Sequence, residues 1–566
     1  MPTLLQASLG LFLSLSLLNS SSASEDDTVV VTSSGPIKGK RVPVGSASVT
    51  SYLGIPYAEP PLGKLRFQKP LPHQPWSHVL EVTDFGKACF QTTDFQWPFN
   101  KMWVANAPHS EDCLFLNVWV PHPRPSAPVP VLVWIHGGGF LVGASSLDLY
   151  NGALLAATEN VIVVSINYRL AFFGFLFLPP EVPGNMGLWD QQLALKWVKE
   201  NAAVFGGDPL QLTLFGHSAG AASVGFHLLS PASQPLFARA VVQSGAPNAP
   251  WAWKDPEHCK LRSLQASQRL GCDDRNHSVA LRCLQEKEMD RGMFQLLMHR
   301  FYPTTDGDFL LDEPRKLLQS GLLQAKPLLI GITREDGSVF ALSGLSDHIE
   351  DDRTSTWEQL LKETMTLFEM SLEEDVAKTV ALKYAEDGHG PEKYHGAMVQ
   401  LCRDYYFLCP LAEAAEKMAA GGSPVYTYSF NHHISGSIWQ EWMGAAHGVE
   451  VPYLFGTLLS LQRANQTNTE ADAPLSLKMM HYWAEFARSG NPTGSVPNEV
   501  QWPLYNATEE NFFHISAGPP EIKKPSPAHH CDFLAAHIFN STLSKKVQED
   551  SSESILEEDT KNETRT

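Results

Sequence analysis

The sequence predicts an α/β fold with a large, mainly parallel central sheet and helices on both faces. Short apolar runs rich in β-branched residues alternate with segments of helical periodicity, a pattern typical of strands joined by crossover helices. The chain is also long enough, with 566 residues of which 43% are hydrophobic, to bury a large core. The clearest predicted strands are residues 129–135, 161–166, 212–215, 240–243 and 328–332.

A long helix is predicted between the second and third of these strands. Residues 186–205 place Leu188, Leu193, Leu195 and Trp197 among the apolar positions of a helical pattern. The order is therefore strand, crossover helix, strand. Residues 343–418 are charged and helical in pattern but contain no motif, and we expect them to belong to a lid and to outer helices.

One domain is expected over residues 24–540, because neither a linker nor an internal repeat interrupts the chain before about Ser541. Residues 1–23 are predicted to be a signal peptide: an apolar run is followed by small residues up to Ala23, although a basic first segment is missing. The polar, acidic tail 541–566 is expected to be disordered.

The expected compartment is extracellular. No later stretch offers the roughly 18 uninterrupted apolar residues of a membrane span, so no membrane anchor is expected. Eight cysteines in an oxidising compartment indicate structural disulfides, although spacing alone does not fix their pairing. Glycosylation is predicted at Asn276, Asn465, Asn506, Asn540 and Asn562.

The net charge of -19 disfavours nucleic acid as a partner, because phosphate binding needs a basic surface. A solvated acidic surface is the simpler explanation of this charge. The alternative is that the field steers cationic substrates toward a cleft.

A candidate nucleophile, Ser218, lies in the segment Gly216-His217-Ser218-Ala219-Gly220. The segment follows a predicted strand and precedes a run of small, helix-forming residues, which is the context of a nucleophile elbow. Small residues at Gly216 and Gly220 permit a turn tight enough to lift the serine hydroxyl to the carboxyl edge of the sheet. The alternative is an ordinary turn.

Donors for a developing oxyanion are predicted in a second glycine-rich segment. His136-Gly137-Gly138-Gly139-Phe140 ends the strand 129–135, and glycine amides can approach a tetrahedral intermediate closely. We expect the amides of Gly138, Gly139 and Ala219 to form the oxyanion hole. A plain glycine turn is the alternative.

The general base is expected later in the chain, after an acid, because nucleophile elbows of this type use that order. His447 stands out among 21 histidines because it lies in a stretch of small residues, Gly444-Ala445-Ala446-His447-Gly448. For the acid, Glu335 and Asp336 follow a predicted strand, and local reasoning does not choose between them.

These segments resemble the type-B carboxylesterase family and, within it, the cholinesterases, from about Val29 to Cys531. The serine segment is similar to the first signature of that family, and Glu111-Asp112-Cys113-Leu114-Phe115-Leu116-Asn117-Val118 is similar to the second. The resemblance implies the α/β-hydrolase fold. It also implies that Asp336 is the catalytic acid, with Glu335 as the fallback, and that Glu450 is a buried supporting carboxylate.

Further residues are assigned by the resemblance alone. It implies disulfides Cys89–Cys113, Cys272–Cys283 and Cys409–Cys531, and leaves Cys259 and Cys402 without an assignment. It also implies a choline site, in which Trp103 offers its ring face to a quaternary ammonium group. The other implied substrate-binding residues are Tyr150, Trp251, Phe340, Trp439 and Asp94.

The sequence departs from the cholinesterase pattern at several positions. His217 replaces the glutamate that precedes the nucleophile in cholinesterases, so cation affinity should fall. Ser343 replaces a tyrosine of the active-site gorge, and the acyl loop between Met293 and Asp306 is shortened. Acyl specificity is therefore left open.

The sequence thus predicts a secreted serine hydrolase that cleaves small-molecule carboxylic esters through an acyl-enzyme, with choline esters as the leading substrate class. A broad carboxylesterase without choline preference is the first alternative. A non-catalytic adhesion module like the neuroligins is the second, disfavoured because all three catalytic residues are present. No cofactor and no metal are expected, and the expected assembly is a monomer or homodimer.

Overall fold

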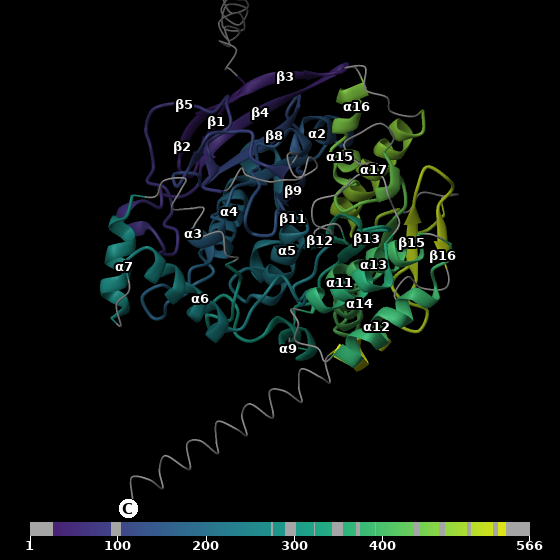
Figure 1. Ribbon diagram of the computed structural model, residues 1–566. Helices are drawn as coiled ribbons and strands as arrows, with labels where there is room; N and C mark the ends of the chain where they lie inside the picture. Colours follow the sequence, from purple (N-terminus) through teal and green to yellow (C-terminus); the bar gives the residue numbers. More distant parts are fainter. Residues whose placement is uncertain are drawn as a thin grey trace, which may run out of the picture.

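The computed structural model describes residues 27–91, 103–272, 276–288, 301–321, 323–341, 355–368, 374–390, 392–434, 441–462, 470–494, 500–523 and 530–538 (Figure 1). Within these residues, none of the helices is long and apolar enough to cross a membrane.

An 11-stranded sheet runs through the described part of the chain. In sheet order the strands are β16 (Glu521–Lys523), β15 (Phe512–Ile515), β14 (Val425–Phe430), β13 (Leu328–Thr333), β12 (Arg239–Gln243), β11 (Gly207–His217), β9 (Val129–Ile135), β10 (Ile162–Ile166), β8 (Phe115–His122), β4 (Ala47–Pro56) and β3 (Lys40–Val44). Every pairing from β15 to β10 in this order is parallel, whereas β8, β4 and β3 at one end and β16 at the other pair antiparallel.

Two short sheets lie outside the large one. β1 (Val29–Thr32), β2 (Gly35–Lys38) and β5 (Leu80–Glu81) form a three-stranded sheet, and β6 (Ala88–Cys89) pairs with β7 (His109–Ser110).

The large sheet is buried on both faces, as its central strand β9 shows. All seven of its residues are buried, and they alternate between two hydrophobic cores: Val131 and Val133 point into one, Leu132 and Trp134 into the other. Because successive side chains of a strand point to opposite faces, these cores lie on opposite faces of the sheet. Continuous apolar runs are typical of parallel strands buried in this way.

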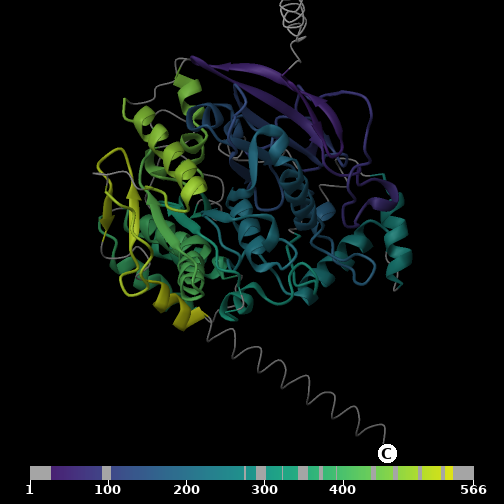
Figure 2. The same cartoon turned by 180° about the vertical axis from the view of Figure 1, so that it is seen from behind.

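Helices cover both faces (Figures 1 and 2). The described helices are α2 (Ala153–Glu159), α3 (Ala171–Phe175), α4 (Met186–Asn201), α5 (Ala219–Leu229), α6 (Pro256–Arg269), α7 (His277–Glu286), α9 (Pro314–Gln319), α10 (Ser338–Ala341), α11 (Trp357–Leu367), α12 (Glu374–Glu386), α13 (Lys393–Arg403), α14 (Cys409–Ala420), α15 (Val451–Leu454), α16 (Thr457–Gln462) and α17 (Asp472–Ser489). α4 and α5 belong to the first core, α2, α15 and α17 belong to the second, and α11, α12 and α13 contribute most of a third cluster.

The α/β prediction is confirmed, and the five predicted strands are all present. The predicted helix 186–205 is α4 followed by a 3-10 turn, Ala202–Phe205, because Gly206 adopts a left-handed conformation with φ 88° and ends it. The helical segment predicted over 343–418 contains α11, α12, α13 and most of α14, with a π-helical turn, Asp404–Leu408, between the last two.

Candidate active site

Ser218 occupies the sharp turn between β11 and α5. Its φ of 57° and ψ of -122° are rare for a residue with a side chain, because Cβ crowds the backbone there. Gly220 permits the turn to pack on β9, since a Cβ at this position would lie 2.0 Å from the carbonyl oxygen of Ile135. The Ser218 amide donates to the carbonyl oxygen of Gln243 at 2.9 Å, which fastens the turn to β12. The strand, turn and helix therefore have the arrangement of a nucleophile elbow.

His447 and Asp336 are joined by a hydrogen bond of 2.6 Å between Nδ1 and Oδ1. The Asp336 side chain is fully buried, and Oδ2 accepts from the amide of Thr333 at 3.3 Å. A carboxylate bonded to Nδ1 holds the proton on that nitrogen and leaves Nε2 to accept a proton from a nucleophile. Asp336 thus has the geometry of an orienting acid.

Glu335 points elsewhere. Its Oε2 accepts from the amide of Ala445 at 2.8 Å, and its Oε1 pairs with Arg334 at 3.1 Å. Glu335 therefore supports the loop that carries the histidine, while the adjacent Asp336 contacts the imidazole itself.

The imidazole of His447 lies beside the serine turn. Its ring centroid is 4.3 Å from that of His217, the residue directly before Ser218. Segments that are far apart in the sequence, the end of β11, the end of β13 and the loop before α15, therefore meet at one edge of the sheet. This is the carboxyl edge, where the ligands of parallel α/β sheets bind.

The glycine-rich segment after β9 packs directly on the nucleophile. A Cβ at Gly137 would lie 3.1 Å from Cβ of Ser218 and 2.6 Å from the carbonyl oxygen of His217. The carbonyl oxygen of Gly138 accepts from the amides of Leu141 and Val142 at 3.0 and 3.1 Å, so the segment is a closed turn. Ala219 is the first residue of α5, where amides lack an intrahelical acceptor. Gly137 and Ala219 therefore flank Ser218, and Gly138 and Gly139 follow Gly137 in the same closed turn.

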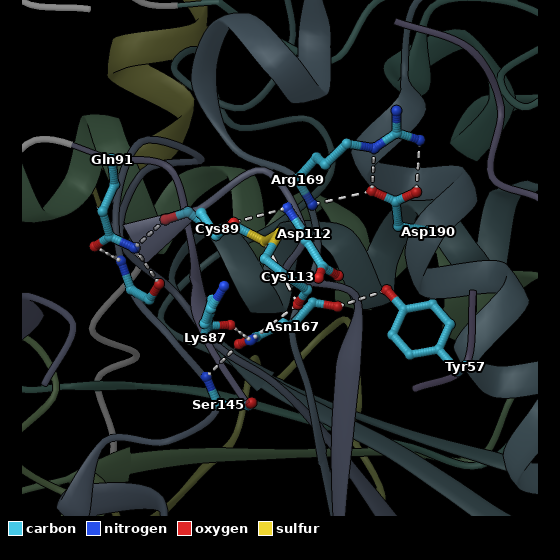
Figure 3. Close-up of a disulfide and its surroundings, with 12 residues drawn as sticks. Tyr57, Lys87, Cys89, Gln91, Asp112, Cys113, Ser145, Asn167, Arg169 and Asp190 are labelled. Carbon is cyan, nitrogen blue, oxygen red and sulfur yellow. Dashed lines mark hydrogen bonds and ion pairs between the residues drawn. A yellow bond between two sulfur atoms is a disulfide. The ribbon is translucent and has the colours of Figure 1, made fainter. Parts of the chain in front are cut away.

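A buried network fixes this glycine segment to the rest of the chain (Figure 3). The Gln91 amide donates to the carbonyl oxygen of Gly143 at 2.8 Å and accepts from its amide at 2.9 Å. Asn167 accepts from the amide of Ser145 at 2.8 Å and donates to the carbonyl oxygen of Cys113 at 3.1 Å. The Cys89–Cys113 disulfide lies at the centre of the network, which therefore anchors the loop that follows the glycine segment, at Gly143 and Ser145.

Asp336 is the carboxylate in contact with His447, and burial affects the charge of its neighbours. Glu450 is fully buried, and burial, followed by the nearby charge of Asp336, raises its pKa to about 8. Glu450 is therefore largely protonated at neutral pH. Burial, followed by the proximity of His447, lowers the pKa of His217 well below its usual value, so His217 is neutral.

Aromatic side chains surround the imidazole. The ring of Phe340 lies 5.2 Å and that of Phe407 4.7 Å from the His447 ring, and Trp251 lies 6.0 Å from Phe407. Trp103, which is partly exposed, stacks on His217 at 5.6 Å. The sequence analysis missed Phe407. It lies in the π-helical turn between α13 and α14, and the aromatic run Tyr405-Tyr406-Phe407 is its one sequence signal.

Not every expected binding residue belongs to this group. Tyr150 is buried and packs in the second core against Trp134 and Phe455, at 5.1 and 6.0 Å. Asp94 and Trp439 lie outside the described residues.

The three disulfides implied by the resemblance are present, namely Cys89–Cys113, Cys272–Cys283 and Cys409–Cys531. Cys259 and Cys402 are buried and free. Of the five predicted glycosylation sites, Asn276 and Asn506 are exposed, and Asn465, Asn540 and Asn562 lie outside the described residues.

Comparisons with known proteins assign the chain to a family. A family model described as "Carboxylesterase family" matches residues 26–534. The acetylcholinesterase of Bungarus fasciatus is 41% identical over 520 residues, which cover 89% of this chain and 85% of that protein. The cholinesterase of Mus musculus is 40% identical over 529 residues, which cover 90% of this chain and 87% of that protein.

Proposed function

This chain belongs to the carboxylesterase family and is a carboxylic ester hydrolase, and we propose that it acts through an acyl-enzyme formed on Ser218. The observation that carries the proposal is the 2.6 Å bond between His447 and Asp336 beside the strained turn at Ser218. A serine hydroxyl is a poor nucleophile without a base, and this arrangement supplies one.

In the first half of the reaction, Nε2 of His447 removes the Ser218 proton while Oγ attacks the carbonyl carbon of the ester. The amides of Gly138, Gly139 and Ala219 stabilise the negative oxygen of the tetrahedral intermediate. His447 then donates its proton to the leaving alcohol. Asp336 stabilises the imidazolium in between, because its carboxylate accepts a hydrogen bond from the Nδ1–H group.

In the second half, water replaces the alcohol. His447 removes a proton from the water, the resulting hydroxyl attacks the acyl carbon, and the acid leaves as Ser218 regains its proton. The acyl group would lie among aromatic side chains near the imidazole, with Phe340, Phe407 and Trp251 as neighbours.

The test is hydrolysis of an uncharged aryl ester by wild type and by Ser218→Ala. We expect the substitution to reduce kcat by at least about 10³-fold. Ser320→Ala, which removes an exposed hydroxyl after α9, is the matched control and should keep full activity. Activity of Ser218→Ala near wild type would refute the mechanism.

Choline esters are proposed to be among the substrates. Two relatives are named acetylcholinesterase and cholinesterase. Trp103 is partly exposed and stacks on His217, the neighbour of the general base His447, where its ring could attract a quaternary ammonium group. Hydrolysis of butyrylthiocholine by wild type tests this proposal directly.

The adhesion alternative predicts a different result. A module without an active serine would not react with an organophosphate, whereas the proposed enzyme should be labelled once, on Ser218. Mass spectrometry of the labelled peptide distinguishes the two.

We also propose that the protein is secreted as one catalytic domain, residues 24–540, after removal of residues 1–23. Residues 1–23 and the tail 541–566 lie outside the described residues. Exposed sequons at Asn276 and Asn506 support passage through the secretory pathway. The protein should appear in the culture medium, as a monomer or homodimer, with a mass that falls after glycosidase treatment. Retention inside the cell without glycans would contradict this.

A further inference from the structure

His217 lies between the candidate choline residue and the general base. Its side chain is 2% exposed. One neighbour is the indole of Trp103, stacked with ring centroids 5.6 Å apart and an interplanar angle of 15°. The other is the imidazole of His447, with ring centroids 4.3 Å apart. One side chain therefore contacts both the surface expected to receive the leaving group and the base that gives this group its proton.

The stack is tightly packed. His217 ends β11, so the turn that places Ser218 also fixes its backbone. From the other side, the loop after His447 closes on it: a Cβ at Gly448 would lie 2.6 Å from the Trp103 ring and 3.1 Å from Cε1 of His217. The three elements thus hold the imidazole in one place.

The groups packed around this pair provide little charge. Burial and His447 lower the pKa of His217, so it is uncharged at neutral pH. Glu450 has a pKa raised to about 8 by burial and by Asp336, and burial raises the pKa of Tyr428, so both are largely uncharged. The rings of Phe340 and Phe407 are apolar. Asp336 provides the negative charge in contact with His447 and is already bonded to Nδ1, while the nearby carboxylate of Glu335 is bonded to the Ala445 amide and to Arg334.

We propose that His217 is a specificity-determining residue that keeps the leaving-group end of the site uncharged, so that the protein selects esters by the size and shape of the alcohol and gains little from a positive charge on it. This inference rests on the proposed function and narrows its substrate class. Choline esters are then cleaved, but uncharged esters of the same shape are cleaved about equally well.

The expected preference for a cationic over an uncharged alcohol follows from the interactions that the site offers to a positive charge. Cation–π attraction to Trp103 at a partly exposed site is worth about a two- to fivefold preference. Once ionised, a carboxylate at position 217 would add a direct attraction to a cationic alcohol. At the upper end of the pH range, where a buried carboxyl group such as Glu450 also loses its proton, we expect at least about a tenfold further gain.

The same position also controls the base. A carboxylate at 217 would stabilise the protonated form of His447 as well as a cationic substrate, because it would face both. Since only neutral His447 can accept the Ser218 proton, the acid limb of kcat/KM would then move to higher pH. His217→Glu should therefore change two measured quantities together: the preference for a cationic alcohol, and the pH below which kcat/KM falls.

The experiment compares two thioesters of butyric acid. One is butyrylthiocholine, and the other is the dimethylbutyl thioester, in which a carbon atom replaces the quaternary nitrogen. For each, kcat/KM is measured from about pH 5 to pH 9. We expect a wild-type preference for the cation of less than about fivefold. His217→Glu should raise this preference at least about tenfold and move the acid limb upward, whereas His217→Gln should do neither.

Two controls make the outcome specific. His78→Glu adds the same charge at an exposed position and should leave the preference ratio as in wild type, which separates the local effect from the net charge of the protein. Trp103→Ala provides a second test if His217→Glu does not fold. It should change the ratio of kcat/KM between the cationic and the uncharged thioester by less than about fivefold.

The inference is overturned if wild type prefers the cationic thioester by more than about tenfold. It is also overturned if His217→Glu changes neither the cation preference nor the pH of the acid limb, or if His217→Gln changes them as His217→Glu does. Failure of the proposed function would look different, because wild type would then hydrolyse neither thioester and Ser218 would not react with an organophosphate.

Discussion

Glu450 lies buried close enough to Asp336 for the two carboxyl groups to interact, and burial, followed by this interaction, raises the Glu450 pKa to about 8. Oε1 of Glu450 accepts from Gln243 at 3.2 Å, while Oε2 has no hydrogen-bond partner among the described residues. A protonated carboxyl group is the form that this environment accepts, because a second negative charge beside Asp336 would be poorly solvated.

Glu450→Gln should therefore become more stable relative to wild type as pH rises. A carboxyl group with a pKa near 8 when folded and near 4.5 when unfolded makes the folded state lose stability over that interval, by up to about 1.4 kcal/mol per pH unit. An amide has no proton to lose, so the variant avoids this loss. Urea unfolding of both proteins near pH 5 and pH 8 measures the effect, with exposed Glu286→Gln as the control. An equal pH dependence for Glu450→Gln and wild type would contradict the assignment.

Asp336 and Glu335 should differ sharply in catalysis although they are neighbours in sequence. Asp336→Asn removes the charge that orients and stabilises the His447 imidazolium, so we expect kcat to fall about 10³- to 10⁴-fold. Glu335→Gln can keep its bond to the amide of Ala445, so its kcat should fall less than about tenfold. Steady-state kinetics on an uncharged aryl ester measure both kcat values. A larger loss of kcat in Glu335→Gln than in Asp336→Asn would make Glu335 the catalytic acid.

The Cys409–Cys531 disulfide should stabilise the protein more than Cys272–Cys283 does. The first closes a loop with a sequence separation of 122 residues and the second one of 11. Loop entropy then predicts destabilisation of about 5 kcal/mol for the double serine variant of the long loop and about 3 kcal/mol for that of the short one. Denaturant unfolding of both double variants measures the difference. A larger loss from the short loop would show that native packing, rather than chain entropy, sets the contribution.

The sequence predicted the strands whose residues are uniformly apolar and missed those with a mixed pattern. β9 has the predicted bounds because all seven of its residues are buried. β11 was predicted from residue 212 but begins at Gly207, since Asp208, Pro209 and Gln211 break the apolar run although Gly207 pairs with Val129. β14 was not predicted, because its tyrosine, threonine and serine residues conceal a strand that is buried throughout.

The site was predictable only in part. Ser218 and His447 stand out because their neighbours are small residues. The choice of Asp336 over Glu335 needed the family resemblance, because adjacent carboxylates look alike in sequence and differ only in where the backbone aims them. Phe407 could not be predicted, since its place beside His447 depends on a π-helical turn within an otherwise regular helical segment.

Gln91 should contribute to the rate although it is not expected to touch the substrate. Its side-chain amide bonds both the amide and the carbonyl oxygen of Gly143, and it also donates to the carbonyl oxygen of Cys89 at 3.0 Å. Gln91→Leu has nearly the same volume but leaves the Gly143 groups without these bonds, which should destabilise the loop by about 1–3 kcal/mol. Because this loop continues from Gly138 and Gly139, the oxyanion donors should lose alignment.

We therefore expect kcat of Gln91→Leu to fall about 10- to 100-fold, with a smaller change in KM, because the donors act mainly in the transition state. Gln319→Leu, at an exposed position of α9, is the matched control and should match wild type. Steady-state kinetics on an uncharged aryl ester, together with thermal unfolding, separate the two effects. A Gln91→Leu variant that loses stability but keeps its kcat would show that the network supports the fold and not the oxyanion donors.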